Sequence, residues 1–255
     1  MQNLICKLIK EYVKNYPQLV NSLSRWQEPL IGFADAADER FLTLRGQVSP
    51  NHAIPTDFLE DARTVIAYFI PFAEEIIKSN YAGTQCSKEW VIAYIETNKL
   101  ILDLNTYLRD QLCAMGYEST VIPATHNFNT QTLLSDWSHR HIAYIAGLGS
   151  FGLNNMLITE KGCCGRLGSL VTNLVIEPSK ASGKENCLYK HGGRCKKCVN
   201  SCVNQALTLD EFDRHRCYTK CLENAEIYNE FGLGDVCGKC LVNMPCSTTN
   251  PARLL

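Results

Sequence analysis

Cysteine is crowded into one part of the chain. Nine of the 14 cysteines lie between Cys187 and Cys246, and the other five are scattered through the first 186 of the 255 residues. So many free thiols in a loop-rich segment would make a poor hydrophobic core, because a thiol is a small side chain. The distribution therefore predicts a separate C-terminal module in which the cysteines bind something rather than fill a core.

The compartment decides between disulfides and metal ligation. Residues 1 to 16 place apolar side chains at helical spacing but interrupt them with Lys7, Lys10 and Glu11, as in an amphipathic core helix. The segment lacks the unbroken apolar stretch of a secretory signal, and a run of about 18 apolar residues occurs nowhere in the chain. We therefore expect a cytoplasmic protein with no membrane partner. Thiols stay reduced in that compartment, which favours metal ligation.

Part of the bacterial ferredoxin pattern C-x2-C-x2-C-x3-C is present. Cys195, Cys198 and Cys202 have the C-x2-C-x3-C spacing, and Gly192 stands where the first cysteine is expected. Cys187 could return across the glycine-rich segment 191–194 and supply the missing thiolate. The candidates downstream, enough to complete eight ligands with one to spare, are Cys217, Cys221, Cys237, Cys240 and Cys246. Short loops of this kind wrap a cubane, so the sequence predicts two [4Fe-4S] clusters.

Two structural zinc sites are the alternative interpretation of the same cysteines. Eight thiolates also make two tetrahedral sites, and C-x2-C pairs are common in zinc knuckles. Three cysteines between residues 195 and 202 fit the faces of a cube better than the paired knuckles of a zinc site.

Charge is unevenly distributed. The formal net charge is -1, which gives no global electrostatic reason to expect a nucleic-acid partner. The segment from Lys180 to Lys220 is nevertheless basic, with nine Lys and Arg residues against four Asp and Glu residues. This charge would offset anionic, thiolate-ligated clusters. A docking patch for an acidic redox partner, or for RNA phosphates, is the alternative.

The rest of the chain has the pattern of an α+β core. Apolar runs over 29–34 and 65–70 predict buried strands, the second ended by Pro71, which cannot donate to a ladder. A long helix is predicted from the N-cap Ser87 to just before Gly116. Other predicted elements are a strand at 121–122, a helix over 133–146, a glycine turn at 147–152, and a hairpin of strands over 156–159 and 167–176. Linker-like composition over 177–185 predicts two domains, 1–180 and 181–255.

Two segments are similar to a known family. One contains Ala146-Gly-Leu-Gly-Ser-Phe-Gly-Leu-Asn-Asn-Met-Leu-Ile-Thr159 and Gly165-Arg-Leu-Gly-Ser-Leu-Val-Thr172, and the other is the cysteine series with Asp213-Arg-His-Arg-Cys217. Together they cover roughly residues 136 to 246 and resemble the epoxyqueuosine reductases and reductive dehalogenases, which are cobalamin-dependent iron-sulfur enzymes. The combination is more specific than either segment alone. The resemblance implies a nitroreductase-like mixed-sheet core followed by a ferredoxin-like module with two [4Fe-4S] clusters.

The resemblance also implies a ligand set for each cluster. One cluster would be held by Cys187, Cys195, Cys198 and Cys246. The other would be held by Cys202, Cys217, Cys237 and Cys240. Cys221 would then be the spare candidate.

Other site residues follow from the same resemblance. Gly147, Gly149 and Gly152 would let the backbone approach a planar cofactor such as a corrin, with Asn154 and Arg166 beside it. Tight packing of the chain against itself explains glycines equally well.

A proton donor is expected close to the glycine turn. Epoxyqueuosine reductases carry a carboxylate in a short segment before this turn, and the matching stretch here, Val121 to Asn127, contains no acid. His126 is the candidate proton donor in its place, because histidine can deliver a proton near neutral pH.

These features predict a reductase that takes electrons from an external donor protein. The electrons would pass through two clusters to cobalamin, or to another acceptor, on the N-terminal domain. The alternatives are an electron carrier that reduces a protein partner, such as an oxidised corrinoid protein, and a structural zinc-binding protein.

Overall fold

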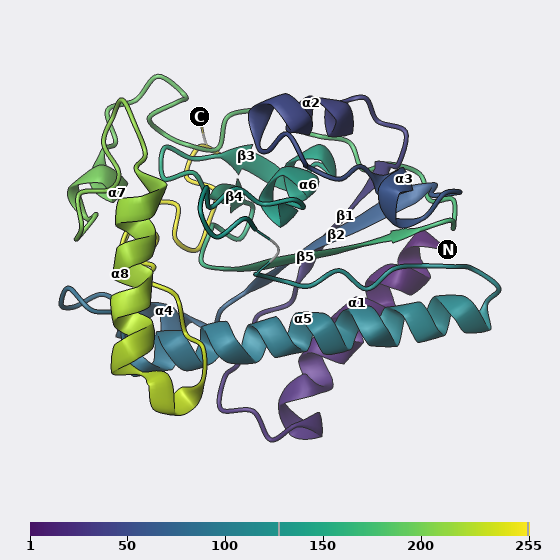
Figure 1. Cartoon of the computed structure of the whole chain (residues 1–255), viewed down its shortest axis with the longest axis horizontal. Helices are drawn as coiled ribbons and strands as arrows, with labels where there is room; N and C mark the ends of the chain where they lie inside the picture. Colours follow the sequence, from purple (N-terminus) through teal and green to yellow (C-terminus); the bar gives the residue numbers. More distant parts are fainter. Residues whose placement is uncertain (127, 254) are drawn as a thin grey trace.

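The core is built on a three-stranded antiparallel sheet. The computed structural model describes residues 1–126, 128–253 and 255, so Asn127 lies outside the described residues. The strand order is β1–β2–β5, in which β1 (Leu30–Asp35) and β5 (Gly165–Thr172) pair with the two edges of β2 (Thr64–Pro71) (Figure 1). Every residue of β2 is buried. A central strand covered on both faces needs apolar side chains throughout, which accounts for the continuous apolar run 65–70.

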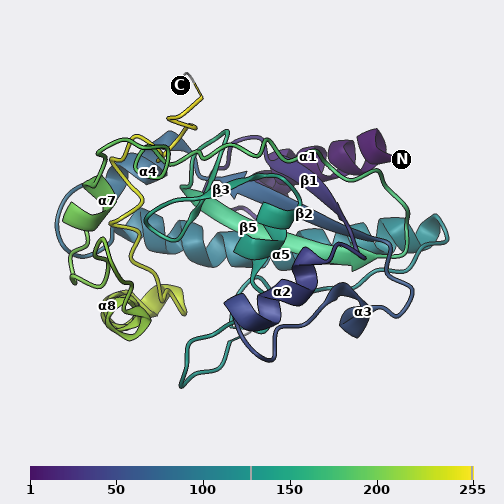
Figure 2. The ribbon, with the colours of Figure 1, turned by 90° about the horizontal axis from the view of Figure 1, so that it is seen from above.

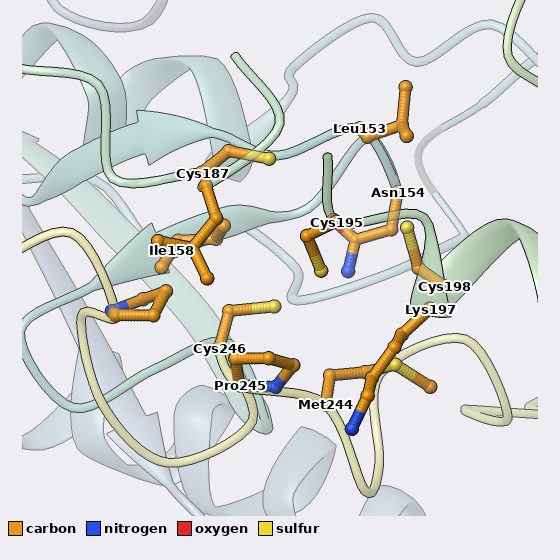
Figure 3. Close-up of a pocket in the computed structure, with 12 residues that line it drawn as sticks. Leu153, Asn154, Ile158, Cys187, Cys195, Lys197, Cys198, Met244, Pro245 and Cys246 are labelled. Atoms are coloured by element: carbon orange, nitrogen blue, oxygen red, sulfur yellow. The ribbon is translucent and has the colours of Figure 1, made fainter. Parts of the chain in front are cut away.

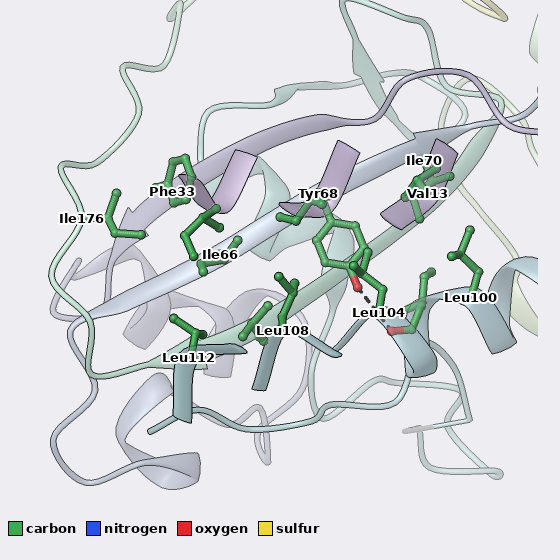
Figure 4. Packing of buried hydrophobic residues seen from close by; sticks show 14 of the residues in the cluster. Val13, Phe33, Ile66, Tyr68, Ile70, Leu100, Leu104, Leu108, Leu112 and Ile176 are labelled. Carbon is green, nitrogen blue, oxygen red and sulfur yellow. Dashed lines mark hydrogen bonds between the residues drawn. The ribbon is translucent and has the colours of Figure 1, made fainter. Parts of the chain in front are cut away.

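Helices cover both faces of the sheet. On one face, α1 (Gln2–Leu19) and α5 (Lys88–Ala114) pack against Ile66 and Tyr68 of β2 (Figure 4). On the other face, α2 (Arg40–Gln47) and α6 (His139–Ile145) pack against Val65 and Ala67. The side chains of residues 65 to 68 face the two layers alternately, because successive side chains of a strand point to opposite faces of the sheet. The result is a layer of helices on each side of a small sheet, an α+β architecture.

Several predictions from the sequence about strand pairing, and one about the start of a helix, are wrong. The core was expected to be a mixed sheet, but both sheets of the described chain are antiparallel. The predicted hairpin of 156–159 with 167–176 does not form, because β4 (Leu157–Thr159) pairs with β3 (Gly149–Phe151), a strand within the glycine turn. The predicted strand at 121–122 joins no ladder. The predicted helix over 133–146 begins only at His139, since Leu133 has a left-handed φ of 55°.

The cysteine-rich segment packs against one end of the core. There α4 (Glu74–Ser79) and the start of α5 lie close to α7 (Lys197–Asn200) and α8 (Arg214–Ile227), whereas α3 (Pro55–Phe58) is at the opposite end (Figures 1 and 2). A single apolar cluster joins Phe72 and Trp90 of the core to Leu241 and Val242 of the C-terminal segment. In the described part of the chain, no helix has the length and apolar character that crossing a bilayer requires.

Candidate metal centre

Four cysteines from three segments line one cavity. These are Cys187, Cys195, Cys198 and Cys246. Figure 3 shows them on different sides of the cavity, with Asn154 and Met244 completing its wall. Cys187 and Cys198 are buried, while Cys195 and Cys246 are partly exposed.

A tight turn brings Cys187 to this cavity. The His191 amide donates to the Cys187 carbonyl (2.8 Å), and the Gly193 amide donates to the Leu188 carbonyl (2.7 Å). Gly192 has a φ of 95°, a conformation that residues with a Cβ rarely adopt. The turn explains the departure from the ferredoxin spacing, since the position expected to be cysteine must here be glycine for the chain to fold back.

The other five cysteines of the module line a second, larger cavity of about 370 Å³. They are Cys202, Cys217, Cys221, Cys237 and Cys240. Cys217 and Cys221 are one turn apart on α8, so both thiols lie on the same face of the helix. Asn154 lines both cavities and donates from Nδ2 to the Cys240 carbonyl (3.3 Å).

The Cys237–Cys240 loop rests on Trp90. The Ser87 hydroxyl caps α5 by accepting from the Trp90 amide (3.2 Å), which fixes Trp90 in the first turn of the helix. A Cβ on Gly238, which has a φ of 77°, would lie 2.4 Å from the indole ring. Only glycine therefore lets the loop approach the indole this closely.

The cavity contains donors that suit a sulfur-rich group. The Trp90 indole N–H is buried, lines the larger cavity and has no hydrogen-bond partner among the described residues. The Ala206 amide donates to Cys202 Sγ (3.2 Å), as backbone amides do to metal-bound thiolates. Lys239 is buried and donates to the Asn80 (2.9 Å) and Ala82 (2.6 Å) carbonyls, which holds its ammonium group near Cys237. The residues present thus fit an anionic iron-sulfur cluster.

Several of the buried thiols resist ionisation in the chain by itself. Burial and, to a smaller extent, neighbouring thiols raise the pKa of Cys198 to about 11 and the pKa of Cys240 well above its usual range. A hydrogen bond with Cys221 instead lowers the pKa of Cys217. Ionising all of these groups together therefore requires a bound cation to balance the charge. No set of three or more His, Cys, Asp or Glu side chains in the described ranges converges on a point that could hold a single metal ion.

Cys163 and Cys164 are adjacent in the chain but make different contacts. The Cys164 thiol donates to the Leu241 carbonyl (3.3 Å), a packing role that ties β5 to the module. Cys163 is buried beside the first cavity, where its amide donates to the Cys246 carbonyl (3.0 Å). A hydrogen bond to Cys163 also raises the pKa of Cys246.

Polar side chains form part of the wall of the larger cavity. Asp235 is buried, accepts from the Tyr94 hydroxyl (2.8 Å), and lies 3.2 Å from His126 Nε2. The Arg166 guanidinium lies over the Tyr94 ring, 4.3 Å from its centroid, and donates to Asn98 (2.7 Å). The Arg166 Nε–H is buried and without a partner in the described chain.

The loop that carries His126 is held by buried hydrogen bonds. Asn105 on α5 donates to the Ile122 carbonyl (3.2 Å), and His139 Nε2 donates to the Pro123 carbonyl (2.8 Å). Ser169 on β5 donates to His139 Nδ1 (2.9 Å). Burial lowers the pKa of His139 to about 4, so the ring is neutral near pH 7 and can keep both bonds.

The three glycines contact the chain itself. A Cβ on Gly149 would lie 2.1 Å from the Ile158 carbonyl oxygen, and one on Gly152 would lie 2.6 Å from Asn154 Oδ1. Gly147 has a φ of 76° and faces the Ala181 backbone. Of the five residues expected to bind a cofactor, Asn154 and Arg166 line the larger cavity, and the glycines shape the turn behind it.

Comparison with known proteins finds likeness in structure only. No protein-family model matches the chain, and no curated protein matches it in sequence. Among solved structures, an epoxyqueuosine reductase with an epoxyqueuosine-modified tRNA-Tyr stem loop matches with a TM-score of 0.56 at 19% identity, over 95% of this chain and 66% of that one. The enzyme from Streptococcus thermophilus matches with a TM-score of 0.52 at 18% identity, over 93% of this chain and 66% of that one. The chain has the fold of the epoxyqueuosine reductases.

The resemblance seen in the sequence is therefore confirmed at the level of fold. The epoxyqueuosine reductase from Bacillus subtilis, whose catalytic loop is swung out of its active site, matches with a TM-score of 0.53 at 18% identity, over 98% of this chain and 68% of that one. This chain spans about two thirds of the length of the epoxyqueuosine reductases it resembles.

Sequence reasoning missed Asp235, Trp90 and Tyr94. Trp90 and Tyr94 lie within the helix predicted from Ser87 to just before Gly116, and the apolar pattern of that helix gives them no other role. Asp235 stands between Gly234 and Val236, outside any motif. Its proximity to Cys237 was the only signal that could have drawn attention to it.

Proposed function

We propose that the chain is an iron-sulfur oxidoreductase with two [4Fe-4S] clusters. Cys187, Cys195, Cys198 and Cys246 would hold one cluster. Cys202, Cys217, Cys237 and Cys240 would hold the other. When bound, the clusters would supply one-electron transfer. The observation that carries the proposal is that all nine cysteines between residues 187 and 246 line one of two cavities that share Asn154.

The spread of the thiols favours clusters over zinc. A zinc site gathers four ligands around one point, at bond lengths of about 2.3 Å for sulfur. No such point exists among the described residues, and the cysteines lie instead around the walls of two cavities. On this proposal residues 181–255 form a ferredoxin-like module, and residues 1–180 form a nitroreductase-like domain that binds the acceptor.

The larger cavity extends beyond the cysteines, which favours an enzyme over a simple carrier. Its walls include aromatic side chains from the core, Phe72, Tyr94 and Phe128, which exclude water and can lie against a flat acceptor. Arg166 would orient that acceptor through its unpartnered Nε–H. Cobalamin, or another acceptor of electrons, would bind here.

His126 is the proposed proton donor to the acceptor. Asp235 would hold its ring at the cavity wall by accepting from Nε2, and Tyr94 fixes the Asp235 carboxylate from the other side. The pair would thus take the place of the carboxylate that is missing from the loop 121–126. Fold likeness supports a reductase related to epoxyqueuosine reductases, with the substrate left to experiment.

The ligand assignment is tested by two cysteine variants. Cys198→Ala removes a buried thiol from the first cavity, so we expect lower iron content and weaker visible absorbance in anaerobically purified protein. Cys113→Ala changes an exposed thiol on α5 and should alter neither. Unchanged iron in the Cys198 variant would remove the assignment.

Titration with cobalamin separates the enzyme from the carrier. Binding of the corrin, followed by reduction of its cobalt by the reduced protein, supports the enzyme. Absence of binding supports a carrier that reduces a protein partner.

A further inference from the structure

A basic loop borders the first cysteine cavity, which Lys197 lines. Lys190, Arg194, Lys196 and Lys197 are all exposed, and they flank the partly exposed Cys195. No Asp or Glu occurs between residues 186 and 209. We call residues 190–197 the basic loop.

The charge of the basic loop is not balanced within the protein. None of its four cations forms an ion pair in the described part of the chain, whereas exposed cations elsewhere, such as Lys78 and Lys99, pair with carboxylates. Cations that offset a buried cluster should lie inside, as Lys239 does at the larger cavity. The basic loop faces solvent, so its charge is available to a partner.

The basic loop is also shaped in advance of binding. The turn that returns Cys187 to the cavity anchors residues 191–193 through three backbone hydrogen bonds, each between 2.7 and 3.1 Å. At its other end α7 begins at Lys197. A surface fixed by its own backbone loses little conformational freedom when a partner docks.

We propose that the basic loop is the docking surface for an acidic protein that carries one electron at a time. This inference rests on the proposed function, because it needs a cluster at Cys195 and Cys198 to accept the electron. Each encounter would oxidise the carrier by one electron and leave that electron on the group held by the first four cysteines. The acceptor would bind at the other cavity, so the donor and the acceptor would occupy separate sites.

An acidic protein fits these observations better than RNA does. The cations lie on both sides of Cys195 in the chain, and Cys195 is a partly exposed metal-ligand candidate. Electron delivery needs a donor close to the metal, whereas phosphate binding does not. Opposite charges would steer the carrier to this edge and raise the rate of productive encounter, by about 10-fold or more at low salt.

Charge reversal tests the proposal. The variant Lys190→Glu, Arg194→Glu, Lys196→Glu leaves Lys197 and every cysteine in place. The matched control, Lys7→Glu, Lys14→Glu, Arg109→Glu, makes the same charge change at exposed positions on α1 and the far end of α5. Stopped-flow spectroscopy would follow reduction of the anaerobic holoprotein by a reduced, acidic [2Fe-2S] ferredoxin and, separately, by dithionite, with iron content as the check on loading.

The expected result is a fall of about 10-fold or more in the ferredoxin rate at low salt for the basic-loop variant. The rate of this variant should rise rather than fall as salt is added, because its loop then repels the acidic carrier and salt screens that repulsion. The ferredoxin rate of the control variant should stay within about twofold of wild type, and excess dithionite should reduce all three proteins to the same final extent. Equal ferredoxin rates in all three loaded proteins would overturn the docking proposal while leaving the clusters intact. If the basic-loop variant lost binding to an RNA stem loop while its ferredoxin rate stayed unchanged, that result would also overturn the docking proposal. Wild-type protein without iron would instead overturn the proposed function.

Discussion

The Trp90 indole N–H is buried against the Cys237–Cys240 loop with no acceptor in the described chain. A hydrogen bond to cluster sulfur stabilises the more negative, reduced state and so raises the reduction potential. Trp90→Phe removes the N–H and keeps an aromatic ring to pack on Phe72, whose centroid is 5.1 Å away. We expect the potential of one cluster to fall while the other stays constant, as measured by redox titration followed by electron paramagnetic resonance.

Trp26→Phe is the matched control for this variant. The Trp26 indole already donates to Thr97 (2.7 Å), so its N–H is not available to a cluster. Its loss should leave both potentials unchanged. If Trp90→Phe also left both unchanged, its N–H would serve packing or the acceptor rather than a cluster.

Cys217 and Cys221 present two thiols for one ligand position in the larger cavity. Because they are one helical turn apart, either thiol can face a group bound there. We expect Cys217→Ser and Cys221→Ser each to retain their iron and the double variant to lose half of it. Iron analysis of the purified proteins decides the matter, and loss of half the iron in Cys217→Ser alone would show that Cys221 cannot substitute.

His139 makes stability depend on pH. Its pKa is lowered to about 4 by burial, while the unfolded chain keeps a value near 6.5, so below that pH the unfolded chain binds a proton that the folded chain refuses. Stability should therefore fall as the pH drops, with a contribution from His139 of about 1 kcal/mol between pH 7.5 and 5.5.

His139→Gln keeps a donor for Pro123 and should show a shallower pH dependence of the denaturation midpoint. His141, whose pKa burial also lowers to about 4, contributes equally in both proteins. If the denaturation midpoints of wild type and variant changed with pH to the same extent, the assignment of a neutral, buried His139 would be contradicted.

The sequence could identify those candidate site residues that belong to a motif with short, regular spacing. Cys195 and Cys198 are such a case, because thiols that line one cavity recur within a few residues. Asp235 and Trp90 could not be identified, since their importance comes from neighbours distant in the chain, His126 and Gly238.

At the scale of elements, α5 and β2 were predictable because periodicity and burial act along one segment. Strand pairing could not be predicted in this way, because it depends on which strands, distant in the sequence, lie side by side in the sheet. Residues 121–122 have the composition of a strand, but Asn105 and His139 take the Ile122 and Pro123 carbonyls, leaving a loop in place of a ladder.

The packing of α5 on the sheet should dominate the stability of the core. Leu104 is fully buried between α5 and β2, so Leu104→Ala should lower the free energy of unfolding by about 3 kcal/mol. Leu102 is 47% exposed on the same helix, and Leu102→Ala should change it by less than about 0.5 kcal/mol. Chemical denaturation compares the two, and equal losses would mean that α5 is not packed as described.

At the scale of the whole molecule, core and module are joined by one apolar cluster and by the cavities between them. Phe72 and Trp90 come from the core, and Leu241 and Val242 come from the module. The predicted boundary near residue 180 stays a prediction. The joint packing means that the cysteines depend on the core for their positions, which the sequence pattern of the module by itself could not reveal.

Metal analysis of protein purified without oxygen tests the central claim most directly. Iron, acid-labile sulfide and zinc would be measured on the same sample. Two [4Fe-4S] clusters predict about eight iron and about eight sulfide per chain, with little zinc. About two zinc per chain, without sulfide, would contradict the account.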